Sequence, residues 1–177
     1  VKNDVAVSIS GTSESIVGTE STFYADVKHA GTPLDYQLLV TVDGNAEIDV
    51  RGKGTNSYTF KKKLTEGYHR IEAKITVNDH FKQNNQYFKT HRVLPKPKLL
   101  FVSTSSSPVE TTLNGIYDVE KSTAIPGNLG KYHTVVIDNY PVGSLNAYSE
   151  QFIDYVTDGN GLIVIGGDSA FDKGNYK

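Results

Sequence analysis

The chain changes its pattern within Leu94-Pro95-Lys96-Pro97-Lys98-Leu99-Leu100-Phe101-Val102. Before this stretch, apolar and polar residues alternate along the chain, and after it apolar residues come in unbroken runs. Alternation with a period of two marks strands that bury one face, whereas strands that are apolar on both faces belong in parallel sheets covered by helices. The sequence therefore predicts two domains of different class, over residues 1–95 and residues 96–177.

The first domain is predicted to be an Ig-like β-sandwich. Its alternating segments are Val5–Ile9, Phe23–Val27, Leu38–Val42, Ile48–Val50, Tyr58–Phe60, Ile71–Val77 and Tyr87–Val93. Turn signals such as Asp43-Gly44-Asn45 and Glu66-Gly67 separate these segments. Short strands at this spacing, without a convincing helix, are typical of a sandwich of two sheets, and a small barrel is the alternative.

The second domain is predicted to be an α/β unit with a parallel sheet. The runs Leu99–Val102, Val135–Ile137 and Leu162–Ile165 are apolar on both faces, as buried parallel strands are. Tyr117–Glu120 is a weaker strand that we expect at an edge. The order of strands and helices predicts a doubly wound, partial flavodoxin-like sheet. About 80 residues is short for such a fold, which has about five or six strands, so we expect this domain to be truncated.

Two helices are expected between these strands. Ser107 and Pro108 have the residue types of an N-cap and a first helical position. A longer amphipathic helix is expected between Gly143 and Gly159, with Ser144 as its N-cap and Gly159 just past its end. The apolar positions of this helix, which recur every three or four residues, are Leu145, Tyr148, Phe152, Ile153 and Val156.

Composition excludes several classes of function. The 177 residues contain no Cys, which excludes a disulfide framework, a Cys-ligated metal site and a thiol nucleophile. Eighteen Lys and Arg stand against 20 Asp and Glu, and this near-neutral balance provides no global field for nucleic acid. No apolar run approaches the ~18 residues of a membrane span. We therefore expect no cofactor and no nucleic-acid partner, and membrane attachment only through parts of a longer parent protein.

Two local patterns in the first domain resemble known modules. The segment Leu64–His69, followed by Ile71, is similar to the L-x-x-G-x-[HY]-x-[IV] corner of Ig-like modules. The residues Asn78-Asp79-His80 and then Asn84-Asn85 resemble the D…NN signature of CARDB-like domains, which are adhesion-related Ig-like modules. This resemblance implies an Ig-like fold and a role in binding other proteins.

The second domain resembles class I glutamine amidotransferase-like domains. Lys98–Val102 is similar to their opening strand, and residues 132–176 resemble a stretch of large membrane proteins that combine von Willebrand factor A domains with such a domain. The resemblance implies a Cys nucleophile at the turn after a central strand, with a His and a Glu downstream. Here that turn reads Gly166-Gly167-Asp168-Ser169 and the chain has no Cys. We therefore assign no catalytic residue and expect a scaffold.

A ligand crevice is the main candidate site. Ligands of open α/β sheets bind at the carboxyl ends of the strands, and two glycines allow a backbone to approach a ligand closely. The predicted ligand-binding residues at these strand ends are Ser103, Asp138, Gly166, Gly167, Asp168 and Ser169. The alternative is a tight strand-to-helix turn that needs glycine and uses the Asp168 or Ser169 side chain as its N-cap.

Neither a Ser-His-Asp triad nor a metal site is assigned. His133 precedes its strand and should lie at the opposite end of the sheet from Ser103 and Ser169. A metal pair of His80 with Asp79, or calcium binding by the same loop, is a weaker interpretation than ordinary turn chemistry, because the loop has few carboxylates.

These observations predict a non-catalytic fragment of a cell-surface or membrane-anchored, extracytoplasmic protein. It would act as a scaffold or protein-interaction module for an unidentified protein partner. The alternative is small-ligand binding or hydrolase activity in the crevice. A third possibility is adhesion through the edge strand at Phe60–Lys63, where a lysine run would otherwise only protect the edge against aggregation.

Overall fold

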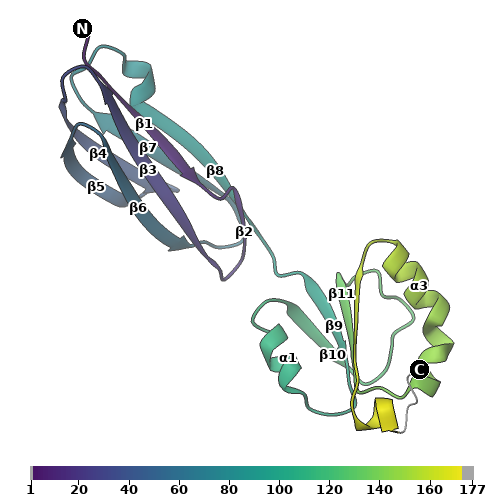
Figure 1. The fold of residues 1–177 in the computed structure, drawn as a ribbon. Coiled ribbons are helices and arrows are strands. Elements are labelled where there is room, and N and C mark those ends of the chain that lie inside the picture. Colours follow the sequence, from purple (N-terminus) through teal and green to yellow (C-terminus); the bar gives the residue numbers. More distant parts are fainter. Residues whose placement is uncertain (1, 173–177) are drawn as a thin grey trace. The chain divides into compact units, whose positions relative to one another are not determined.

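The computed structural model describes residues 2–172, and the chain divides into two compact units after Pro95 (Figure 1). The described elements of the first unit are β1 (Asp4–Gly11), β2 (Glu14–Ile16), β3 (Glu20–Ala30), β4 (Asp35–Val42), β5 (Asn45–Lys53), β6 (Asn56–Lys63), β7 (Gly67–Thr76), the 3-10 helix η1 (Lys82–Asn85) and β8 (Gln86–Leu94). Each predicted alternating segment lies within or largely within one of these strands.

The first unit is a sandwich of two sheets with an Ig-like arrangement. One sheet has the order β1-β3-β6 and the other β2-β8-β7-β4-β5. Side chains from both sheets form one buried cluster, for example Phe23 of β3 with Leu38 of β4 and Ile71 of β7. Two separate sheets packed face to face confirm the sandwich and exclude the small barrel.

One strand of the sandwich was not predicted. β2 contains only three residues and pairs with β8 in parallel, Ser15 opposite Val93. A segment this short is too brief to display a period of two, so alternation alone could not reveal it. The predicted edge position of the lysine run is confirmed, because β6 is the outer strand of its sheet.

The second unit is an α/β structure built on a parallel sheet. Its described elements are β9 (Lys98–Val102), α1 (Pro108–Leu113), β10 (Asp118–Ser122), β11 (Thr134–Asp138), α2 (Val142–Leu145), the 3-10 turn η2 (Asn146–Tyr148), α3 (Ser149–Thr157), β12 (Gly161–Ile165) and the π-helical turn η3 (Asp168–Asp172). The strand order is β10-β9-β11-β12, and all neighbouring pairs are parallel. β10 therefore lies at an edge, as the sequence predicts.

Helices cover both faces of this sheet, as Figure 1 shows. On one face Leu100 and Val135 pack with Tyr155 of α3, and on the other Phe101 packs with Val109 of α1. α1 begins as predicted, because Ser107 Oγ accepts a hydrogen bond from the backbone N–H of Val109. Within the described residues, no helix is long and apolar enough to cross a membrane.

The predicted helix between Gly143 and Gly159 is wrong in two respects. It is divided into α2, η2 and α3, and Tyr148, with φ −110° and ψ 7°, interrupts it, so that Ser144 lies inside α2 rather than capping α3. Its buried side is only partly the predicted one, because Leu145, Tyr148 and Phe152 pack against the core, whereas Ile153 and Val156 are 64% and 47% exposed. Tyr155, which the sequence does not single out, is buried and donates its hydroxyl hydrogen to the Tyr132 carbonyl.

Candidate functional site

The predicted crevice residues lie at one edge of the parallel sheet. Ser103 directly follows β9, Asp138 is the last residue of β11, and Gly166 directly follows β12. Because β11 lies between β9 and β12 and the three strands are parallel, these residues share the carboxyl edge, where Asp138 pairs with Ile165. The order of the strands along the chain reverses between β9 and β11, and open parallel sheets bind ligands at such a point.

The two buried residues of the crevice differ in how they are used. The Ser103 hydroxyl accepts a hydrogen bond from the Ser105 N–H at 3.3 Å, so it stabilises its own loop. Asp138 is only 8% exposed, and its carboxylate makes no hydrogen bond or ion pair with the side chains and backbone that the structure describes. Among the residues of the crevice, Asp138 therefore offers an acceptor that the described part of the chain does not already use.

The turn after β12 is held by a residue that the sequence analysis did not single out. Asn139 has a positive φ of 50°, and its Oδ1 accepts hydrogen bonds from the N–H groups of Ser169 (2.8 Å) and Ala170 (3.2 Å). A Cβ on Gly167 would lie 2.6 Å from Asn139 Cγ. The cap of η3 thus comes from Asn139, at the end of the neighbouring strand, rather than from the Asp168 or Ser169 side chain. Gly167 is needed for this close approach.

His69 is held in its charged form at the corner of the sandwich. Its Nδ1 lies 2.6 Å from Asp43 Oδ2 and its Nε2 lies 2.7 Å from the Thr65 carbonyl oxygen. Both partners are acceptors, so both ring nitrogens must carry hydrogen. Burial lowers the pKa of His69, but the hydrogen bonds to Asp43 and Thr65 outweigh this effect and raise it. For Asp43, burial raises the pKa, but the hydrogen bonds from His69 and from the Arg70 N–H outweigh this effect, so the pKa of Asp43 is lowered.

His91, which pairs across the strands with His69, holds a different part of the sandwich. Its Nδ1 donates to the Thr12 carbonyl oxygen at 3.0 Å, and its Nε2 lies 2.8 Å from the Ser15 hydroxyl oxygen. His91 is fully buried. Ser15 lies at the surface side of this contact and lines a cavity of about 360 Å³ whose other lining residues include Thr12 and Ser21. The contacts tie the short strand β2 to β8. Ser15 and His91 are far apart in the sequence, so no local motif could reveal this pair.

The D…NN residues fasten a loop to the first strand. The fully buried Asp79 carboxylate accepts hydrogen bonds from the Val5 N–H and the Asn85 side-chain amide, and Lys82 Nζ lies 3.1 Å from it. His80 contacts Lys2 instead of Asp79. Among the described residues no group of three His, Cys, Asp or Glu side chains could hold a metal. These contacts fit the interpretation that the Asp79 and Asn85 side chains stabilise a turn. The Lys82 ammonium group already balances the negative charge of Asp79.

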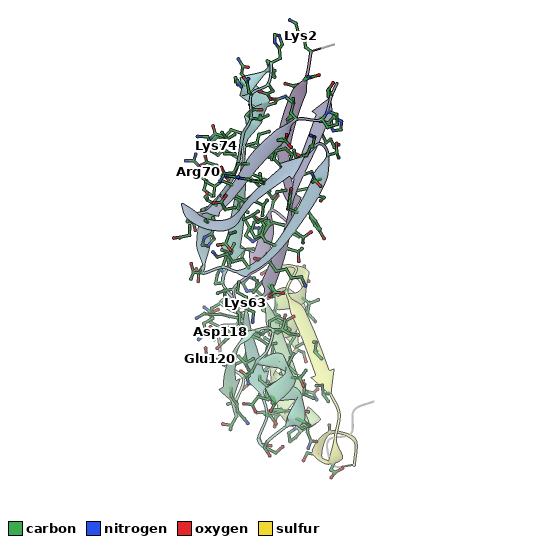
Figure 2. All side chains as sticks on the ribbon, turned by 90° about the vertical axis from the view of Figure 1, so that its left-hand side faces the viewer. Lys2, Lys63, Arg70, Lys74, Asp118 and Glu120 are labelled. Carbon is green, nitrogen blue, oxygen red and sulfur yellow. The ribbon has the colours of Figure 1, made fainter. Side chains whose placement is uncertain are left out.

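The outer face of the five-stranded sheet presents aromatic rings covered by arginines. Tyr68 is 72% exposed with the Arg92 guanidinium 5.5 Å from its ring centre, and Phe88 is 49% exposed with the Arg70 guanidinium at 4.3 Å. In β7 and β8 these four residues lie at alternating positions on one side of the sheet. Figure 2 shows Arg70 on the same side as Lys74. We call Tyr68, Arg70, Phe88 and Arg92 the aromatic–arginine patch.

Comparisons with known proteins give matches among solved structures, three of which each cover about half of this chain. No protein-family model matches the sequence, and no curated protein matches it. Two structures of a CARDB domain from Pyrococcus furiosus, one of them a crystal structure in complex with di-metal ions, each cover 52% of this chain. They are 21% and 23% identical, with 90% and 96% of their own chains covered and TM-scores of 0.49 and 0.48. A β-glucosidase from Listeria innocua covers 51% of this chain and 16% of its own, at 12% identity and a TM-score of 0.34.

Proposed function

We propose that the chain is a non-catalytic interaction module that docks a protein partner on the aromatic–arginine patch. The observation that supports this is the exposure of Tyr68 and Phe88, each stacked against an arginine. Tyr and Arg dominate the energetically important residues of protein interfaces, because they combine a large apolar area with directed polar groups. The arginines also hold the rings in place, which reduces the entropy lost when a partner binds.

The second unit serves as a scaffold in this proposal. The order β10-β9-β11-β12 is that of the first strands of a flavodoxin-like sheet, which supports a flavodoxin-like, amidotransferase-like assignment. At the turn where the resemblance implies a Cys, the chain has Gly166-Gly167-Asp168-Ser169. The Asn139 side chain holds this turn by accepting a hydrogen bond from the Ser169 N–H. The resemblance further supports an extracytoplasmic, surface or membrane-anchored parent protein. Cell fractionation with surface proteolysis tests that location, and a protected, soluble parent would contradict it.

Site-specific photo-crosslinking tests the docking proposal. A benzoylphenylalanine in place of Tyr68 should crosslink to one protein of the source cells. The same replacement at Tyr24, which is 42% exposed on β3 of the other sheet, should not. Equal crosslinking from both positions, or none from Tyr68, would contradict a docking role for the patch.

A second candidate function is small-ligand binding in the crevice, which Asp138 favours, because its carboxylate has no polar partner in the part of the chain that the structure describes. Thermal-shift screening against sugars, nucleotides and amino acids should find a compound that raises the melting temperature of the full chain. The effect should disappear in Asp138→Asn and persist in Asp118→Asn, where the exposed β10 carboxylate is the matched control. A shift that survives Asp138→Asn, or no shift with any compound, would contradict this second function.

A further inference from the structure

A polar cavity lies at the end of the sandwich where β1 leads into β2 and β2 leads into β3 (Figure 1). It has a volume of about 360 Å³, within the range of about 300–1,000 Å³ that small-molecule sites occupy. Two of the residues that line it are acidic, and six carry a hydroxyl group: Thr12, Ser15, Thr19, Ser21, Thr22 and Tyr24. The cavity therefore has the size and the lining of a site for one small polar ligand.

Two of these hydroxyl groups share one ring nitrogen. The Oγ atoms of Ser15 and Ser21 lie 2.8 Å and 3.4 Å from His91 Nε2. A single ring nitrogen makes one good hydrogen bond, and a distance beyond about 3.2 Å is long for such a bond. Ser21 is only 5% exposed, so its hydroxyl is a buried polar group with a weak partner. A ligand in the cavity would give this hydroxyl the hydrogen bond that His91 makes with Ser15.

The two acidic residues of the cavity limit the charge of its ligand. Glu14 and Glu20 lie 3.8 Å from the charged groups of Arg92 and Lys61, which is too far for a hydrogen bond. Their carboxylate oxygens can therefore still accept hydrogen bonds, and a carboxylate only accepts them. Neither Lys nor Arg is among the residues that line the cavity. A negatively charged ligand would be repelled, whereas a neutral ligand with several hydroxyl groups would find acceptors.

Tyr24 adds an apolar surface to the cavity. Its side chain is 42% exposed, and its neighbours across the sheet, Ser10 of β1 and Thr59 of β6, are small. In the described part of the chain no arginine or lysine stacks on this ring. A pyranose ring has C–H groups on its faces and hydroxyl groups around its rim. An exposed aromatic ring beside carboxylate and hydroxyl groups offers a contact to both.

We propose that this cavity is a binding site for a neutral saccharide. One pyranose ring would place a C–H face against Tyr24, and its hydroxyl groups would donate to the carboxylates of Glu14 and Glu20. The Ser21 hydroxyl would complete the contacts at the buried end. The site shares one ion pair, Glu14 with Arg92, with the aromatic–arginine patch. It needs no docked protein, so the two sites can be tested separately.

Proton–nitrogen NMR spectra of the full chain, titrated with the methyl pyranosides of glucose, galactose and mannose, test the proposal. At least one sugar should shift the amide signals of residues 11–24 and leave those of residues 71–76 unchanged. The uronic acid of the same sugar should bind about tenfold more weakly or worse, because its carboxylate meets the two glutamates. No shift with any of the three sugars would overturn the proposal. So would equal shifts with calcium chloride alone, because the cavity would then hold a cation.

Two substitutions locate the contacts. Tyr24→Ala should weaken binding of the sugar about tenfold or more, because the aromatic face is lost. Tyr87→Ala is the matched control, since Tyr87 is also 42% exposed but lies on β8 outside the cavity, and it should change binding by less than about twofold. Circular dichroism shows whether each variant is folded, and equal weakening by both would contradict the site.

Glu20→Gln keeps the shape of the side chain and removes its charge. It should weaken binding of the neutral sugar, because an amide accepts fewer hydrogen bonds than a carboxylate. It should also reduce the difference between the sugar and its uronic acid, because one of the two repelling charges is gone. A purely structural role of Glu20 would not change this ratio. An unchanged ratio in folded Glu20→Gln would overturn the assignment of the carboxylates to the ligand.

Discussion

Gly52 occupies a position in the sandwich where the packing leaves no room for a side chain. A Cβ there would lie 2.5 Å from the hydroxyl oxygens of both Tyr36 and Tyr58, which contact each other at 3.1 Å. Burial, the largest effect, raises the pKa of Tyr36 to about 12, so this hydroxyl stays protonated and can donate at neutral pH. The glycine is therefore required by the tyrosine pair rather than by the backbone conformation.

Gly52→Ala should lower the free energy of unfolding by about 1–3 kcal/mol, because the tyrosine pair must move to admit the methyl group. Gly127→Ala is the control, since a Cβ at Gly127 would meet nothing within 4 Å. Its effect should stay within about 0.5 kcal/mol. Urea unfolding of the full chain measures both, and equal effects would show that the tyrosine pair does not restrict this position.

His69 makes the stability of the first unit dependent on pH. Its pKa is raised in the folded state, so its contribution is complete below the unfolded pKa of about 6.5 and is lost as the pH rises through the folded value. Asp43 has a lowered pKa, so its contribution is lost as the pH falls through its folded value. The nearby Lys62 slightly opposes the charge on His69.

His69→Gln should therefore reduce the free energy of unfolding more at about pH 6 than at about pH 9. Nitrogen-15 NMR of the histidine ring should show hydrogen on both ring nitrogens of His69 at neutral pH. For His91 it should show hydrogen on Nδ1, which faces the Thr12 carbonyl oxygen. A neutral His69 ring, or a stability loss independent of pH, would contradict the charged corner.

At the scale of the element, η3 depends on a side chain from another strand. Asn139→Ala removes the acceptor for the N–H groups of Ser169 and Ala170 and places alanine at a positive φ. Loss of a helix cap typically costs about 1 kcal/mol. Amide exchange at Ser169 and Ala170 should therefore quicken by roughly fivefold or more, since 1.4 kcal/mol corresponds to a factor of ten.

Ser144→Ala is the matched control for this prediction. The sequence suggests Ser144 as a helix cap, but the structure places it inside α2. Its replacement should leave exchange in α3 and η3 unchanged. Faster exchange in α3 for Ser144→Ala, with no change at η3 for Asn139→Ala, would mean that the caps are assigned to the wrong residues.

The sequence predicts elements better than it predicts contacts between them. Alternation reveals the strands of the sandwich except the short β2, and unbroken apolar runs reveal β9, β11 and β12, because the order of apolar residues within each segment reflects whether one face or both are buried. The buried side of α3 is predicted correctly at Phe152 but not at Ile153 and Val156, because these two residues satisfy the helical period as well as the buried Tyr155 does. The roles of Asn139, His91 and the Tyr68–Arg92 stack depend on partners distant in sequence, and no local pattern contains them.

At the scale of the whole molecule, the two units offer different surfaces. The sandwich presents exposed aromatic rings held by arginines, and the parallel sheet carries the candidate ligand residues at its carboxyl edge. At that edge the Asn139 side chain accepts a hydrogen bond from the Ser169 N–H in the turn after β12, and Ser103 and Asp138 are buried polar residues. The exposed rings of the sandwich are the surface on which we propose that a partner protein docks.

The affinity of the crosslinked partner for patch variants tests this account most directly. Tyr68→Ala with Phe88→Ala should weaken binding of the purified partner by at least tenfold, because central aromatic residues of an interface typically contribute about 2 kcal/mol or more. Tyr24→Ala, on the other sheet, should change the dissociation constant by less than about twofold, as expected for a residue outside the interface. Binding by the double variant as tight as that of the unaltered chain would contradict the assignment of the patch as the docking surface.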